Sequence, residues 1–456
     1  MRIYFVIVIL LLNATLFAQQ FSMAQAPETP PLTKEERADI LNSIADLFES
    51  NYIFPDKGKM VKTKLNELAK KDAYKDITHI KKLLEQLVFD IQEIIHDSHF
   101  NLAHIPAMSN MNWVQPGDSE EDKKAAEEET LNHAKLNNFG ITKAEILEGN
   151  IGYLNLSSFN APVEGAKPQL AAAFNMLQYT KALIVDMRQN TGGLPEYVSL
   201  AESYFFEKPT LTSTIYNRTE NTTTKFITLA EPGGAKYLGK EVYVLTGPTS
   251  ASGGESFPYD LQAFKKATII GEQTVGGAHG FTPVMLNLNK QGNVAVLMPD
   301  MREENAVTKT NWEGVGVQPD IKVSAKFALE TAHKKALEKL LQNEKSEEQK
   351  AQYQSLIAKI DYQIQKMQSG GSAKNLQEYA GNYGIRTVSV ENGELMFSRE
   401  NGPKIKLIES GEETYDLDIP VSPKPRVRFA RDAQGKVNGF YLTGGDGNEI
   451  FNARNN

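Results

Sequence analysis

The stretch from Glu241 to Phe281, EVYVLTGPTSASGGESFPYDLQAFKKATIIGEQTVGGAHGF, decides the fold of the chain. Its apolar, β-branched run from Val242 to Thr246 predicts a buried strand that ends at a Gly-Pro pair. A helical pattern follows the small-residue turn, and Ala267 to Gly271 predicts a second buried strand. A hydroxyl on such a turn lies beside the N–H groups of the helix start, which favour a developing oxyanion. We therefore predict that Ser252 is a nucleophile.

The spacing SxxE from Ser252 to Glu255 is also ordinary helix-capping chemistry. This spacing alone does not separate a capping serine from a nucleophile, so the interpretation depends on the rest of the chain.

A second strand and loop precede this unit. Ala182 to Asp186 (ALIVD) predicts a continuous buried strand, and Arg188 to Gly193 (RQNTGG) follows it as a loop. Glycines in such a loop let the backbone approach a ligand and turn its N–H groups toward it. A nucleotide-phosphate loop is the competing interpretation, but the Walker lysine and the GxGxxG spacing are absent.

The N-terminal residues predict an export signal. Arg2 gives a positive start, and Ile3 to Leu12 is an apolar run too short to span a bilayer. Leu16-Phe17-Ala18 or Ala24-Gln25-Ala26 then offers a small-residue cleavage site. We expect residues 1–26 to be a signal peptide and the mature protein to be exported to the periplasm or the medium. No other stretch of the sequence is long and apolar enough to cross a membrane.

The composition excludes several classes of function. The 456 residues contain no cysteine, so the protein uses neither disulfides nor a thiol nucleophile. A formal net charge of −8 provides no basic face for nucleic acid. We expect no cofactor and no metal.

Hydrophobic periodicity divides the mature chain into five parts. They are an N-terminal helical domain (27–105), an acidic connecting segment (106–150), an α/β core with a mixed sheet covered by helices (151–324), a long helix with a linker (325–372), and a small antiparallel β domain (373–456). Leu211 to Tyr216 and Thr224 to Ala230 predict a β pair on the edge of the core sheet. The long helix should break near Lys345.

The helical domain ends at His96-Asp97-Ser98-His99, where the helical period gives way to a strand pattern. A helix C-cap with a packed histidine is one interpretation of this segment. A zinc site made of His96, His99 and His104 is another, but these residues lack a standard ligand spacing.

Four ordered motifs resemble those of the tail-specific (C-terminal-processing) serine proteases, in the branch of the tricorn and retinoid-binding-protein relatives. They are Asp97-Ser98-His99, DxRxNxGG at Asp186 to Gly193, SxxE at Ser252, and WEGxGVxPDI at Trp312 to Ile321. The resemblance implies a crotonase-like or ClpP-like core. It also implies a member without a PDZ domain, because the acidic segment is too short to hold one.

One departure from the family indicates the catalytic base. Family members with a Ser-Lys dyad carry a lysine in the loop after GExT, whereas this loop reads EQTVGGAH from Glu272 to His279. Lys265 and Lys266 lie on the predicted helix, where they are more simply solvated charges. The resemblance then implies a Ser-His-Ser-Glu tetrad and an oxyanion hole, made of the following residues: Ser252, His99, Ser98 and Glu313 for the tetrad, and Gly253 with Gly192 or Gly193 for the hole.

The function predicted from the resemblance is an exported serine-type peptidase that cleaves peptides or protein tails through an acyl-enzyme. The alternative is a non-catalytic binding protein for hydrophobic ligands or peptides on the same fold. The expected partner is a peptide or unfolded protein substrate, with an oligomer left open.

Overall fold

The computed structural model describes residues 29–105, 120–369 and 375–455, apart from residues 392, 401, 412, 420–423, 433 and 445–448. The predicted signal peptide, part of the acidic segment and most of the predicted linker lie outside these residues. In the described part of the chain, no helix is long and apolar enough to cross a membrane.

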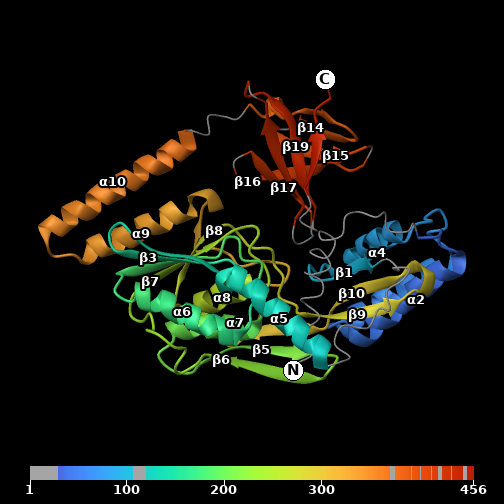
Figure 1. Ribbon diagram of the computed structural model, residues 1–456, viewed down its shortest axis with the longest axis horizontal. Coiled ribbons are helices and arrows are strands. Elements are labelled where there is room, and N and C mark those ends of the chain that lie inside the picture. Colours follow the sequence, from blue (N-terminus) through green and yellow to red (C-terminus); the bar gives the residue numbers. More distant parts are fainter. Residues whose placement is uncertain are drawn as a thin grey trace.

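The N-terminal helices share their core with a distant hairpin (Figure 1). These elements are α2 (Lys34–Asn51), α3 (Pro55–Lys70) and α4 (Ile80–Ile95), followed by β1 (Asn101–Ile105), with β9 (Phe281–Asn287) and β10 (Asn293–Pro299) as the hairpin. The predicted capping box of Thr33 and Glu36 opens α2. β1 pairs antiparallel with β10, and Val294, Val296 and Met298 are fully buried against the helices. This pairing ties the segment after α4 to the α/β core.

A mixed six-stranded sheet forms the centre of the molecule, in the order β12-β8-β7-β4-β3-β2. Its strands are β2 (Ile141–Leu147), β3 (Ile151–Leu156), β4 (Ala182–Asp186), β7 (Glu241–Thr246), β8 (Thr268–Gly271) and β12 (Ile321–Lys322). All neighbours run parallel except β2 and β3. Strand β2, at one edge of this sheet, lies in the segment that was predicted to be an acidic connection between domains. Helix α5 (Glu120–Leu136) precedes this strand.

Helices cover both faces of this sheet, as the continuous apolar strands predicted. One face packs against α6 (Val163–Leu177), α7 (Pro195–Glu202) and α8 (Gly253–Ala263), and the other against α9 (Ala328–Asn343) and α10 (Glu347–Ser369). The predicted break near Lys345 falls between α9 and α10. These two helices belong to the core, because Ala332, Leu337 and Tyr353 pack under the sheet.

The predicted β pair forms, but it is not on the edge of the central sheet. β5 (Leu211–Asn217) and β6 (Thr222–Ile227) join β11 (Met301–Asn305) in a separate antiparallel sheet. The prediction of an edge position was wrong because the partner, β11, lies about 75 residues further along the chain and carries no local signal.

The C-terminal residues form an eight-stranded antiparallel sheet in sequential order. Its strands are β13 (Gly381–Tyr383), β14 (Arg386–Glu391), β15 (Glu394–Arg399), β16 (Ile405–Gly411), β17 (Thr414–Leu417), β18 (Arg426–Arg431), β19 (Val437–Thr443) and β20 (Glu449–Ala453). The Asn455 amide donates to the Asn382 carbonyl (2.7 Å), so the chain end returns to the first strand. The result is a nearly closed domain around its own apolar core.

Candidate active site

Two serines of the turn between β7 and α8 have different environments. Ser250 is fully buried, and its hydroxyl donates to the Met187 carbonyl (2.8 Å) and accepts from the Gly247 amide (3.0 Å). Ser252 is partly exposed and caps α8 with φ 54° and ψ −124°, a sparsely populated conformation for a residue other than glycine. Ser250 holds the turn, which leaves Ser252 as the candidate nucleophile.

The backbone next to Ser252 supplies two neighbouring N–H donors. The described residues contain no hydrogen-bond partner for the amides of Gly253 and Gly193, whereas the Gly192 amide donates to Asn190 Oδ1 (2.8 Å). A Cβ at Gly253 would lie 3.2 Å from the Gly193 nitrogen, and one at Gly192 would lie 2.8 Å from the Gly253 nitrogen. Of the two predicted glycines, Gly193 is therefore the better partner for Gly253 in an oxyanion hole.

Glu255 connects the nucleophile turn to the loop after β8. Its buried carboxylate accepts hydrogen bonds from the amides of Ser252 (2.8 Å), Gly276 (2.7 Å) and Gly277 (2.9 Å), and from the Thr274 hydroxyl. Burial raises the pKa of Glu255 to about 7, although these hydrogen bonds oppose the shift. The glutamate of SxxE thus fixes the loop that follows β8 relative to Ser252.

Gly277 of this loop packs directly against Ser98 and His99. A Cβ on Gly277 would lie 2.7 Å from both Ser98 Oγ and His99 Cε1. The His99 ring also lies near the Phe281 ring, with centroids 5.7 Å apart. The loop after β8 is the one in which the Ser-Lys relatives carry a lysine. In this protein, the imidazole of His99 packs against that loop at Gly277.

A second histidine, His279, lies between two carboxylates. Its Nδ1 is 2.7 Å from Asp97 Oδ2 and 3.5 Å from Glu313 Oε2, and it is buried. The Tyr52 hydroxyl donates to the same Asp97 oxygen (3.2 Å). Glu313 Oε2 accepts from the amides of Ala278 (2.6 Å) and His279 (3.1 Å). These bonds fix both carboxylates.

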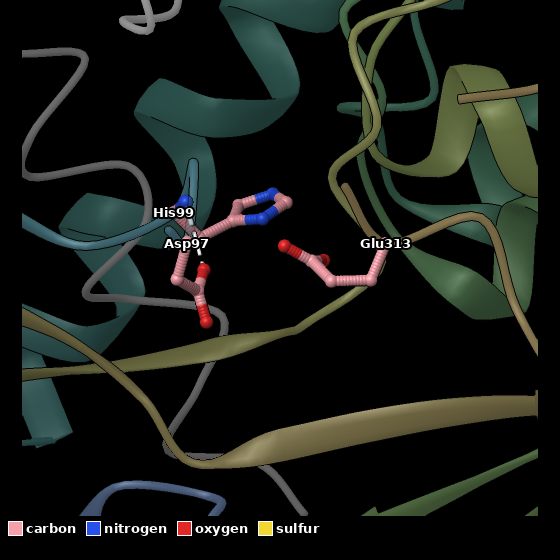
Figure 2. Close-up of side chains that lie close together, drawn as sticks. All are labelled: Asp97, His99 and Glu313. Carbon is pink, nitrogen blue, oxygen red and sulfur yellow. Dashed lines mark hydrogen bonds between the residues drawn. The ribbon is translucent and has the colours of Figure 1, made fainter. Parts of the chain in front are cut away.

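The imidazole of His99 and the Glu313 carboxylate point toward one another, while the His99 backbone N–H donates to Asp97 Oδ1 (3.1 Å; Figure 2). His99 Nδ1 and Glu313 Oε1 are both buried without a hydrogen-bond partner among the described residues. The facing atoms of these two side chains are thus available to a third group.

Burial is the largest influence on the ionisation of this site. Burial, and after it the negative charge of Asp97, raises the pKa of Glu313 to about 7. Burial also lowers the pKa of His99, against the attraction of Asp97. For Asp97, burial acts to raise the pKa, but the hydrogen bond from His279 and the histidine charges lower it below its usual value. The pKa values of the two carboxylates therefore move in opposite directions, so that Asp97 is ionised and Glu313 titrates near neutral pH.

Two predicted contacts are not formed in the described structure. Neither a hydrogen bond between Ser252 and His99 nor one between Glu313 and Ser98 is present among the described residues. The backbone amides of Ala278 and His279 donate to Oε2 of Glu313 instead, and the contact of Glu313 with Ser98 stays a prediction.

The structure does not assemble the histidines of the alternative zinc interpretation. His104 Nε2 bonds to the Gln291 carbonyl (2.6 Å), and His96 is the exposed C-cap of α4 with φ 50°. Among the described residues, one group of three metal-type ligands comes together, formed by Asp97, His99 and Glu313. Only His99 is common to the two sets.

Sequence reasoning missed the roles of Asp97 and His279. Both stand inside motifs used above, one in the Asp-Ser-His segment and the other at the end of the loop after GExT. Their pairing joins residues that are 182 positions apart. The only hint in the sequence was that both are ionisable residues next to predicted loops.

Two family models match the chain. Residues 150–323 match the model described as Peptidase family S41, and residues 23–139 match the N-terminal domain of Peptidase_S41 in eukaryotic IRBP. The α/β core of the chain belongs to peptidase family S41. The matches cover both the strand and helix unit around Ser252 and the segment that carries His99.

A carboxy-terminal-processing protease of Bartonella bacilliformis is 30% identical to this chain over 183 residues. The match covers 39% of each protein, so the chain spans about two fifths of the length of this curated relative.

Solved structures of similar proteins include mature CPAF, at 11% identity, covering 74% of this chain and 98% of that one with a TM-score of 0.45. They also include the tricorn protease, at 14% identity, covering 72% and 37% with a TM-score of 0.40.

Proposed function

We propose that this chain is an exported serine peptidase that cleaves peptides or protein tails through an acyl-enzyme on Ser252. His99 is the general base, Glu313 and Ser98 orient it, and the amides of Gly253 and Gly193 form the oxyanion hole. The central sheet, on this proposal, is a crotonase-like or ClpP-like core, and the chain belongs to the tricorn and retinoid-binding-protein branch.

One residue, Gly277, carries this proposal. Its amide is held by Glu255, one helical turn from Ser252, and a Cβ added to it would lie 2.7 Å from Cε1 of His99. The nucleophile turn and the histidine segment therefore meet at the same loop. A serine hydroxyl is a weak nucleophile at neutral pH and needs such a base.

The competing lysines lie at the wrong end of the nucleophile helix. Lys265 and Lys266 follow the C-terminus of α8, about 15 Å along the helix from Ser252. Lys266 Nζ also pairs with Glu207 (3.1 Å). His99 is the better candidate for the base.

The chemistry follows from these positions. His99 takes the proton of the Ser252 hydroxyl as Oγ attacks the scissile carbonyl, and the negative oxygen of the tetrahedral intermediate lies at the two glycine amides. The imidazolium then gives its proton to the leaving amine, and water repeats the sequence to release the acid. Substrate binding must close the Ser252 to His99 contact, since catalytic hydrogen bonds often tighten only with substrate.

A non-catalytic binding protein is the second candidate function. The observation that favours it is that Ser252 and His99 make no hydrogen bond within the described residues. In that case Ser252 is a strained helix cap next to a peptide-binding or apolar-ligand site, and no acyl-enzyme forms.

Covalent labelling with a fluorophosphonate probe separates the two functions. We expect wild-type protein to be labelled on Ser252 and Ser252→Ala to be unlabelled with unchanged circular dichroism. Ser250→Ala is the matched control, because its hydroxyl is bonded on both sides, and it should still be labelled if it folds. Labelling of Ser252→Ala at the wild-type rate would assign the nucleophile to another residue. A folded wild-type protein that never reacts would favour the binding protein.

A further inference from the structure

Three side chains from two distant segments converge at the loop after β8. Asp97 and His99 come from the loop between α4 and β1, and Glu313 comes from the segment between β11 and β12. Each offers one ligand atom, and these atoms all lie within 4.8 Å of one another (Figure 2). An ion bound at about 2.0–2.2 Å from each atom would draw the three side chains slightly closer together.

Two atoms of these ligand groups lack a hydrogen-bond partner among the described residues. His99 Nδ1 and Glu313 Oε1 are fully buried atoms with no hydrogen-bond partner in the described part of the chain. Buried polar atoms are normally paired, so each unpaired one calls for an explanation. A cation between the facing side chains would satisfy both lone pairs at once.

We propose that Asp97, His99 and Glu313 form a binding site for Zn²⁺. One imidazole nitrogen and two carboxylate oxygens are a ligand set that zinc accepts, with a fourth position left for water or substrate. Mg²⁺ and Ca²⁺ prefer six or more oxygen ligands, which this site does not offer.

Residues around the ligands hold them in place. Tyr52 and His279 bond to Asp97, and two backbone amides bond to Glu313 Oε2, leaving Oε1 for the ion. Such second partners orient metal ligands and raise affinity. The site therefore resembles a preformed set of ligands rather than a group of loose surface carboxylates.

Zinc at this site would inhibit the peptidase, a consequence that rests on the proposed function. A neutral imidazole has one N–H and one lone pair. If Zn²⁺ takes the lone pair of Nδ1, Nε2 carries the proton and cannot accept one from Ser252. Removal of the ion with a chelator restores the base, so inhibition is reversible.

Direct binding tests the site independently of activity. Isothermal titration of the full-length Ser252→Ala chain with Zn²⁺ should give one ion per protein. His99→Gln and Glu313→Gln, introduced separately, should each weaken it at least about tenfold. His96→Asn and His104→Gln are matched histidine controls and should bind as the parent does. Mg²⁺ in excess should not compete.

Three outcomes overturn the site: no stoichiometric binding, unchanged binding in both ligand variants, or loss of binding in a histidine control. Circular dichroism checks each variant, and Asp97→Asn replaces any ligand variant that does not fold. Inhibition of Ser252 labelling by Zn²⁺, reversed by EDTA, supports the inhibitory role, and an enzyme that is active while zinc is bound contradicts it. If the protein has no activity, the proposed function fails, while the titration still decides the site.

Discussion

The protein contains two groups of buried carboxylates, and their partners differ. At the candidate active site, Asp97 and Glu313 face two histidines. In the second group, Glu202 of α7, Asp260 of α8 and Glu303 of β11 have no positively charged partner among the described residues. The second group is held by neutral donors, including the Ser256 hydroxyl to Glu303 (2.9 Å). We call these three residues the acid cluster.

The difference decides which carboxylates are charged. At the active site the histidines lower the pKa of Asp97, while burial raises that of Glu313. In the acid cluster, burial first and neighbouring carboxylates second raise the pKa of Asp260 well above its usual value, and burial raises that of Glu202 to about 8. Histidine partners thus accompany an asymmetric pair of carboxylates suited to proton transfer, whereas their absence leaves protonated acids that affect stability.

The strongest test of this comparison replaces one side chain in each group by glutamine. His99→Gln should slow Ser252 labelling and peptide hydrolysis about a thousandfold, since general base catalysis contributes about 10²- to 10⁴-fold. Glu202→Gln should leave both rates unchanged. His96→Asn controls for the loss of a nearby histidine. Equal losses in His99→Gln and Glu202→Gln would remove the functional distinction between the two groups.

A backbone change should have the next largest effect. In Gly192→Ala the new Cβ would lie 2.8 Å from the Gly253 nitrogen and from Ser252 Cβ, at φ 103°. We expect kcat to fall about a hundredfold through the oxyanion hole, with KM little changed. Steady-state kinetics with a fluorogenic peptide separates the two constants. Gly239→Ala is the control, because Gly239 also has positive φ (67°) but nothing lies within 4 Å of its Cβ position. A rise in KM alone would place Gly192 in substrate binding.

Glu313→Gln should cost less than either change, about tenfold in kcat/KM. The glutamine keeps an oxygen for the Ala278 and His279 amides but loses the charge that stabilises the imidazolium of His99. Comparison with His99→Gln in the same assay measures the difference between base and orienting acid. A loss as large as that of His99→Gln would give Glu313 a direct part in proton transfer.

Local patterns predicted the elements that carry the nucleophile. The apolar run ending at Thr246 and the small-residue turn correctly placed Ser252 at the start of α8. The choice between Gly192 and Gly193 could not be predicted, because it depends on the Asn190 side chain turning back to the Gly192 amide.

Contacts between distant segments could not be predicted from the sequence. The pairing of β1 with β10 and the bond between Asp97 and His279 each join residues more than 180 positions apart, and no period or spacing encodes them. The acid cluster is likewise assembled from α7, α8 and β11. The composition gives the number of acidic residues, but only the fold shows that these three share one buried environment.

The smallest expected effect concerns the acid cluster and the pH dependence of stability. In the unfolded chain, Glu202 loses its proton near its ordinary pKa of about 4.3, whereas in the folded protein burial raises that pKa to about 8. Between these values the folded state binds more protons than the unfolded state. The contribution of Glu202 to stability is therefore complete below pH 4 and is lost as the pH rises toward 8, by at most about 1.4 kcal/mol per pH unit.

Glu202→Gln removes this titration while keeping the shape and hydrogen-bonding capacity of a neutral acid. The free energy of unfolding should fall less steeply between pH 5 and pH 8 in the variant than in the wild type, so the variant should be relatively more stable at pH 8. Urea unfolding followed by circular dichroism at several pH values measures both slopes. Glu207→Gln is the control, because Glu207 is an exposed glutamate whose pKa is lowered rather than raised. A wild-type slope that Glu202→Gln leaves unchanged would mean that Glu202 is already ionised in the folded protein, and the contrast between the two carboxylate groups would then lose its basis.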